Sequence, residues 1–191
     1  MSLPDGWRAA VNVLAGAAKP FEADCFRSVE LTYGHPDDVI SGEGTRLHGG
    51  RFVPRGMRAV HASLDEDTGA REVTARKARL RGRAQILLKD YPRLTYVISI
   101  EAEKCVDFRS VDRSTVLGQT LAAALDLSDL TDSQTVGQYL VAKGVQAALV
   151  PSAVGPGANI VVFLDTRSRP KIEIRNRGDI LEAIQRLAQR T

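Results

Sequence analysis

Residues 147–164 read AALVPSAVGPGANIVVFL, in which two compact apolar runs flank a segment rich in proline and glycine. The runs at 147–150 and 160–164 have the length expected of buried strands. Residues 151–157 have the composition of a loop made of turns, because proline and glycine favour turn conformations. This stretch therefore predicts two strands joined by a loop that carries Ser152.

Strand patterns and helix patterns are irregularly interleaved in the rest of the chain. Alternating or apolar residues predict strands at 26–33, 58–62, 94–102 with an extension at 105–108, and an edge strand at 171–175. Apolar residues at helical spacing predict helices at 7–18, 66–83, 114–125, 133–143 and 180–187. Residues 34–56 hold six glycines and two prolines and are expected to form one long loop, a feature that is more often functional than idle.

The order of these elements favours an α+β fold. A doubly wound parallel sheet would require regular alternation of strand and helix, which this chain lacks. At 191 residues and 43% hydrophobic composition, the chain can bury one substantial core. We therefore expect a single domain in which helices flank a central mixed, mostly antiparallel sheet.

Composition argues against several classes of function. The net charge is +3, but lysine and arginine are scattered and aromatic residues make up only 5%, so direct contact with nucleic acid is not expected. The apolar runs are too short to span a bilayer and no signal peptide is visible, so we expect no membrane contact and a cytoplasmic location. The two cysteines and three dispersed histidines indicate neither a disulfide framework nor a metal site.

Three polar residues lie at the edges of predicted elements far apart in the chain: Arg27, Glu72 and Ser152. Side chains that meet from distant rigid elements are a common way to build a pocket. Taken singly, Glu72 is typical of a helix surface and Ser152 of a turn. A serine hydrolase is disfavoured because the Gly-x-Ser-x-Gly motif is missing.

Several short segments resemble the RES family, named for an Arg, a Glu and a Ser, whose members are NAD-degrading toxins of bacterial toxin–antitoxin pairs. The resemblance rests on the order and spacing of Cys25-Phe26-Arg27, Ser41-Gly42-Glu43-Gly44-Thr45-Arg46-Leu47-His48-Gly49-Gly50-Arg51-Phe52, Val60-His61-Ala62-Ser63, Arg71-Glu72-Val73, Ala147-Ala148-Leu149-Val150-Pro151-Ser152 and Asn159-Ile160-Val161-Val162-Phe163. The matching segments extend over most of residues 25–163.

The resemblance implies a fold like that of ADP-ribosyltransferases, with NAD held in a cleft of a central split sheet. On this basis we expect an N-terminal helical segment at 1–24, a RES-like catalytic domain at 25–165, and a C-terminal strand and helix at 166–191 packed on the same domain. The implied catalytic residues are Arg27, Glu72 and Ser152. The implied NAD-binding residues are Arg27, Gly50, Arg51, Phe52, His61, Ser152 and Asn159.

The implied reaction is cleavage of NAD at the nicotinamide–ribose bond, with inorganic phosphate as the expected co-substrate and no prosthetic group or metal. Glu72 would stabilise the ribosyl cation, Arg27 and Arg51 would hold phosphates, and Ser152 would position phosphate or another acceptor. Glycine at position 50 would let the backbone approach the ligand, and Phe52 would cover an aromatic ring. NAD depletion would arrest growth, and the expected partner is an Xre-like helix-turn-helix antitoxin; homodimerisation is left open.

His61 departs from the family, which usually has a tyrosine at the matching place. A protonated imidazole would stack poorly on cationic nicotinamide. Two other readings stay open beside NAD phosphorolysis, the first because the acceptor is not known and the second because of His61. One is an ADP-ribosyltransferase or NAD glycohydrolase on the same fold, and the other is a family member that binds NAD without cleaving it.

Overall fold

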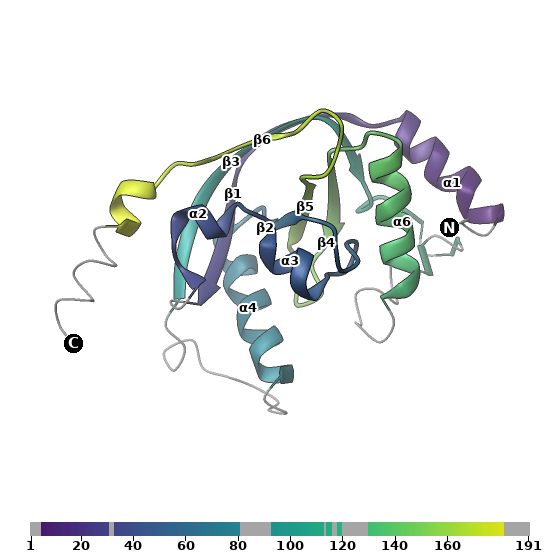
Figure 1. Cartoon of the computed structure of the whole chain (residues 1–191). Helices are drawn as coiled ribbons and strands as arrows, with labels where there is room; N and C mark the ends of the chain where they lie inside the picture. The colour runs from purple at the N-terminus through teal and green to yellow at the C-terminus, as the bar shows by residue number, and fades with distance from the viewer. Residues whose placement is uncertain are drawn as a thin grey trace.

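The computed structural model describes residues 5–30, 33–80, 93–112, 114–115, 118–119 and 130–181. The elements in chain order are α1 (Asp5–Gly16), β1 (Lys19–Glu30), α2 (Pro36–Val39), α3 (Glu43–His48), β2 (Ala59–Ser63), α4 (Glu66–Leu80), β3 (Arg93–Asp107), α6 (Thr131–Ala142), β4 (Ala147–Pro151), β5 (Ala158–Phe163) and β6 (Lys171–Ile174). In this described part of the chain, helices flank one six-stranded sheet, whose strands β1, β3 and β6 form an uncovered edge of the molecule (Figure 1), and this arrangement confirms the predicted α+β class.

The sheet consists of two antiparallel halves that are joined by short contacts. Its strand order is β1-β2-β5-β4-β3-β6, and β1 also pairs with β3 along most of its length, so five strands close into a barrel-like ring. Between the halves, β1 meets β2 at the single register pair Phe26–Ser63. On the other side, β3 and β4 share a short parallel ladder from Cys105–Ala147 to Asp107–Leu149. The prediction of a mixed, mostly antiparallel and split sheet is thus confirmed.

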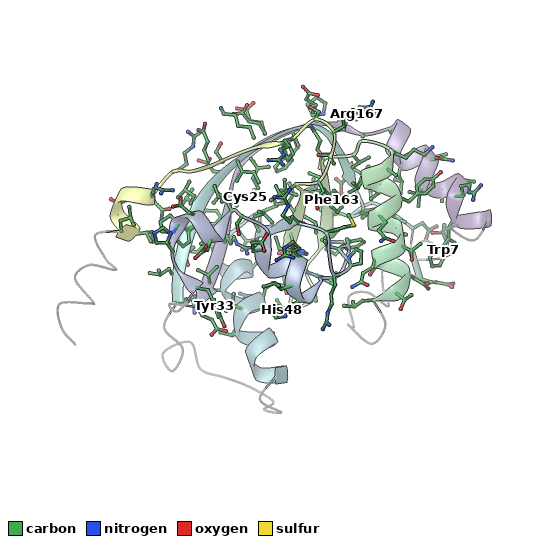
Figure 2. The ribbon with its side chains drawn as sticks, viewed as in Figure 1. Trp7, Cys25, Tyr33, His48, Phe163 and Arg167 are labelled. Atoms are coloured by element: carbon green, nitrogen blue, oxygen red, sulfur yellow. The ribbon has the colours of Figure 1, made fainter. Side chains whose placement is uncertain are left out.

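The half-sheet β2-β5-β4 is buried on both faces, which explains why residues 160–163 are continuously apolar. One face meets the apolar side chains of β1 and β3, and this core includes Cys25, Val60, Tyr96, Ile98, Ile100, Ile160 and Val162. The opposite face is covered by α1 and α6, and its core includes Trp7, Val11, Phe52, Phe108, Val136, Leu140, Val161 and Phe163. Trp7 and Phe163, labelled in Figure 2, belong to this second core.

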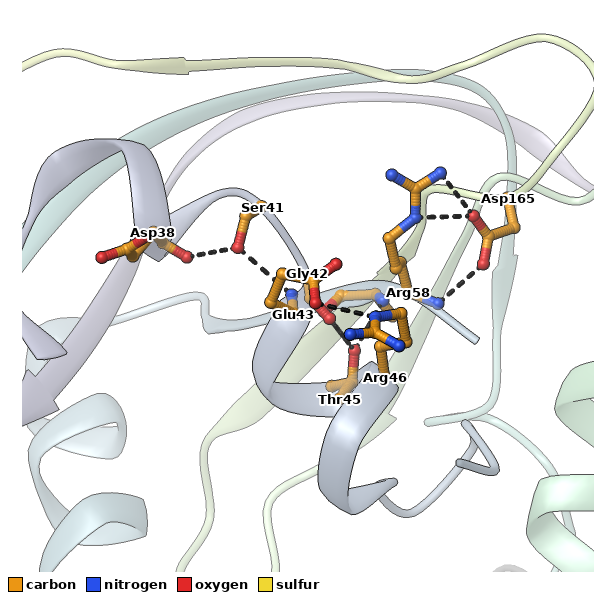
Figure 3. Close-up of polar contacts among 9 residues, drawn as sticks. Asp38, Ser41, Gly42, Glu43, Thr45, Arg46, Arg58 and Asp165 are labelled. Atoms are coloured by element: carbon orange, nitrogen blue, oxygen red, sulfur yellow. Dashed lines mark hydrogen bonds and ion pairs between the residues drawn. The ribbon is translucent and has the colours of Figure 1, made fainter. Parts of the chain in front are cut away.

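The prediction of one unstructured loop at residues 34–56 is wrong, because the segment contains the short helices α2 and α3. The hydroxyl of Thr45 on α3 donates to the carbonyl of Gly42 at 2.7 Å (Figure 3). The same hydroxyl accepts the amide of Ala59 at 2.7 Å, which ties α3 to the start of β2. Arg58 next to this strand binds Asp165 through its backbone amide at 2.7 Å. Helices of four and six residues are too short to show an apolar periodicity.

Two strand boundaries also differ from the prediction. β1 spans Lys19–Glu30 and so begins well before the strand predicted at 26–33. β3 is continuous from Arg93 to Asp107 and includes the predicted extension. The predicted edge strand is present as β6, antiparallel to β3. Most of the helix predicted at 114–125 and the parts predicted at 81–83 and 182–187 lie outside the described residues.

Helix α6 approaches the backbone of Phe52 so closely that a larger side chain at Gly137 should destabilise the protein. A Cβ atom added to Gly137 would overlap the carbonyl oxygen of Phe52, whereas one added to Gly44 on α3 would meet nothing within 4 Å. We expect Gly137→Ala to lower the free energy of unfolding by about 1–3 kcal/mol, because overpacking outweighs the roughly 1 kcal/mol gain in helix propensity. Gly44→Ala is the matched control and should be neutral or stabilising. Equal denaturant midpoints for the two variants would contradict the close approach.

Candidate functional site

The Glu72 carboxylate collects donors from several parts of the chain. Its Oε1 accepts hydrogen bonds from the Ser152 hydroxyl at 2.8 Å, the Ala153 amide at 3.1 Å and the Asn159 side-chain amide at 2.6 Å. The Glu72 side chain is 22% exposed and that of Ser152 is buried, so these bonds form at the edge of the interior. Oε1 receives all the contacts recorded for this carboxylate among the described residues, which fixes its orientation.

Arg51 completes the cluster around Glu72. One guanidinium nitrogen lies 3.4 Å from Glu72 Oε1 and another lies 3.5 Å from the carbonyl oxygen of Pro151. The Arg51 side chain is only 10% exposed. It extends from a tight turn in which Gly50 and Val53 form an isolated bridge. A largely buried guanidinium beside a carboxylate offers planar donors for an anionic ligand.

The loop after β4 runs beside α4 and approaches it closely at two glycines. A Cβ on Gly157 would overlap the Thr68 hydroxyl, and a Cβ on Gly155 would come within 3.3 Å of Arg71. The Ser152 amide closes the loop by donating to the Gly157 carbonyl at 2.9 Å. The glycines therefore let the loop approach α4 closely enough for Ser152 to reach Glu72.

Asn159 is oriented by a residue that sequence reasoning missed. Asn159 on β5 and Ser63 on β2 are register partners, so their side chains share one face of the sheet. The Ser63 hydroxyl donates to Asn159 Oδ1 at 2.7 Å, which turns the Asn159 amide nitrogen toward Glu72. Ser63 lies within the quoted stretch 60–63, but only the strand register shows which serine faces Asn159.

Arg27 and His61 lie where the two half-sheets separate. The Arg27 guanidinium on β1 donates to the backbone carbonyl of His61 on β2, next to Phe26–Ser63, the single pair that joins these two strands. The His61 ring packs against Gly50, because a Cβ added to Gly50 would lie 2.9 Å from the His61 Nε2 atom. Arg27 is thus connected to the Glu72 cluster through His61, Gly50 and Arg51.

Phe52 differs from the expectation that it covers a ligand ring. Its side chain is 2% exposed and stacks on Phe108 with ring centroids 5.7 Å apart. Phe52 is therefore a core residue in this structure. The sequence Gly-Gly-Arg-Phe could not reveal this, because an aromatic residue next to a binding turn serves equally well as an anchor.

Other reactive groups lie apart from this cluster. Cys25 and Cys105 are free thiols, and burial raises the pKa of each to about 12, so both stay protonated at neutral pH. Across the described residues no group of three His, Cys, Asp or Glu side chains could hold a metal ion. None of the helices in the described part of the chain has the length and apolar character needed to cross a bilayer.

The cluster combines a carboxylate, a guanidinium, a hydroxyl and an amide within hydrogen-bonding distance. A carboxylate can oppose positive charge that develops on a bound sugar, and a guanidinium can bind phosphate oxygens. The site residues brought together are Glu72, Ser152, Asn159 and Arg51, with Gly50, His61 and Arg27 connected to them by contact.

Comparisons with known proteins agree with this fold. The family model described as RES domain matches residues 24–180 of this chain. Curated proteins give no match. A chain of the M. tuberculosis MbcT–MbcA toxin–antitoxin complex is similar in structure, with a TM-score of 0.68 and 17% sequence identity, covering 96% of this chain and 100% of that chain. The resemblance found in the sequence is thus confirmed, and the chain belongs to the RES domain family.

Proposed function

We propose that this RES domain protein is a toxin that cleaves NAD at the nicotinamide–ribose bond by phosphorolysis. The observation that carries the proposal is the convergence of Ser152, Asn159 and Arg51 on one oxygen of Glu72. The products would be nicotinamide and a phosphorylated ADP-ribose.

The reaction needs a stabilised cation more than a strong base. Nicotinamide leaves as a neutral molecule from a cationic glycosidic bond, and positive charge then develops on the ribose. Glu72 opposes that charge, and its fixed orientation means that little reorganisation is needed as the bond breaks. The Ser152 and Asn159 bonds to Oε1 hold this carboxylate in place.

Arginine side chains bind the pyrophosphate in this proposal. Arg51 is ion-paired with Glu72 in the structure, and phosphate oxygens would offer its guanidinium a second anionic partner. Arg27 lies at the separation of β1 and β2 and would bind phosphate from that side. His61, packed on Gly50, would line the nicotinamide end.

Inorganic phosphate is the proposed acceptor, and the protein needs no prosthetic group. Ser152 would position phosphate through its hydroxyl, which accepts the Val154 amide at 3.1 Å. The same geometry with water or a protein as acceptor gives an NAD glycohydrolase or an ADP-ribosyltransferase.

The proposed biological role follows from loss of NAD. The protein would act in the cytoplasm, and NAD depletion there would arrest growth of the cell. The similar solved structure is described as a toxin–antitoxin complex, which supports an antitoxin partner for this chain. We propose an Xre-like helix-turn-helix antitoxin that covers the cleft, so that the toxin itself makes no contact with DNA.

A second candidate function is binding of NAD without efficient cleavage. It is favoured by His61, which occupies the place of the family's usual tyrosine and packs directly on Gly50. Protonation of this imidazole would repel a cationic nicotinamide.

One assay separates these functions. Purified protein incubated with NAD should release nicotinamide, and omission of inorganic phosphate should abolish the release. Release that is unchanged without phosphate would indicate water or a protein acceptor. A thermal shift with NAD and no nicotinamide release would establish the binding function and contradict the proposed chemistry.

The role of Glu72 is tested by Glu72→Gln. The amide oxygen can still accept from Ser152 and Asn159, so the fold should be kept, although loss of the Arg51 ion pair should lower the thermal stability. Loss of the charge should lower kcat about 10²-fold or more. Glu66→Gln, on the exposed first turn of the same helix, is the matched control and should keep full activity. Full NAD consumption by Glu72→Gln would refute its role.

The role of Arg51 is tested by Arg51→Lys. An ammonium group cannot reproduce the planar pair of donors, so the KM for NAD should rise about 10- to 100-fold, the effect of losing a hydrogen bond to a charged group, with a smaller change in kcat. Arg46→Lys, an exposed arginine on α3 that pairs with Glu43, is the control and should leave KM unchanged. An unchanged KM in Arg51→Lys would remove Arg51 from the NAD site.

A further inference from the structure

Helix α6 holds the backbone of the turn that presents Arg51. The Gln134 side-chain amide donates to the carbonyl of Gly50 at 3.0 Å. The Ser133 hydroxyl donates to the carbonyl of Arg51 and also reaches the Leu130 carbonyl at 3.0 Å. Two consecutive carbonyls of the turn are therefore hydrogen-bonded to neighbouring residues at the start of one helix.

The carbonyl of Phe52, the residue after Arg51, also faces α6. Gly137 lies so close to the Phe52 carbonyl oxygen that no Cβ could fit between them. The Phe52 ring is anchored at the same time by its stack on Phe108 in the core. Backbone contacts on the helix and a buried ring thus restrain the turn in position and in orientation.

These restraints matter because arginine has a long, flexible side chain. Where the Cα atom of Arg51 lies, and the direction in which its side chain leaves the backbone, decide whether the guanidinium reaches Glu72 and Pro151. Those contacts are 3.4 and 3.5 Å long, so a small shift of the turn would break them. A misplacement of about 1 Å can be costly in a binding or catalytic site.

We propose that Gln134 and Ser133 are positioning residues that set the place of the Arg51 guanidinium and thereby the affinity of the site for NAD. The proposal rests on the proposed function for the identity of the ligand. Neither residue is expected to touch the substrate. Gln134 and Ser133 act through backbone carbonyls, so the chemistry at Glu72 proceeds without them once NAD is bound.

Gln134→Met tests this, because methionine keeps the length of the side chain and removes the donor. The KM for NAD should rise about 3- to 10-fold, the effect of one neutral hydrogen bond, with kcat within about 2-fold of the wild type. Gln138→Met, one turn later on α6, is the matched control and should keep the wild-type KM. An unchanged KM in Gln134→Met, or an equal rise in Gln138→Met, would overturn the proposal.

A combined variant distinguishes positioning of Arg51 from a general effect on folding. If Gln134 acts through Arg51, adding Gln134→Met to Arg51→Lys should change KM by less than about 2-fold further. If the rise in KM of the double variant equals the product of the two single rises, Gln134 acts independently of Arg51, and the proposal is overturned. Should Gln134→Met fail to fold, Ser133→Ala is carried through the same comparison.

The ligand-free protein separates failure of this proposal from failure of the proposed function. Absence of both NAD binding and nicotinamide release in the wild type would refute the proposed function. Denaturant midpoints of the two single variants and the double variant then report on positioning alone, since the Arg51–Glu72 ion pair forms without a ligand. If the midpoint shift of the double variant is smaller than the sum of the two single shifts, positioning is supported. If it equals that sum, the proposal is overturned.

Discussion

The arrangement of the site depends on a single oxygen atom, Oε1 of Glu72. Three hydrogen bonds and an ion pair meet there, from the loop after β4, from β5 and from the turn before Val53. A partly buried carboxylate is costly unless donors satisfy it, so these contacts hold the helix, the loop and the strand in one relative position. The same contacts leave a negative charge in a fixed place, which the proposed reaction through a cationic sugar requires.

The split sheet provides the setting for this atom. Because β1 and β2 meet at only one residue pair, the two half-sheets diverge beside Arg27 and His61. The half-sheet β2-β5-β4 is anchored on both faces by apolar cores, so its strands can carry Ser63 and Asn159 at a polar edge.

Local patterns predicted much of this. Apolar runs located β2, β4 and β5, and the resemblance to the RES family pointed to Glu72, Ser152, Asn159 and Arg51, which the structure brings together. The roles of Gly157 and Ser63 escaped prediction because they depend on which atoms approach in space. The helices α2 and α3 escaped it because a tertiary contact through Thr45, more than any periodic pattern, holds α3 in place.

The sequence by itself determined the class of fold, the location of most strands and the family, because hydrophobic spacing and short motifs are properties of contiguous residues. Only the tertiary structure decided which side chains face one another. Phe52 illustrates the difference: its neighbour Arg51 faces Glu72, while its own ring enters the core against Phe108. That choice is made by the packing of α6 and β3 around the turn, and those segments lie far from residue 52 in the chain.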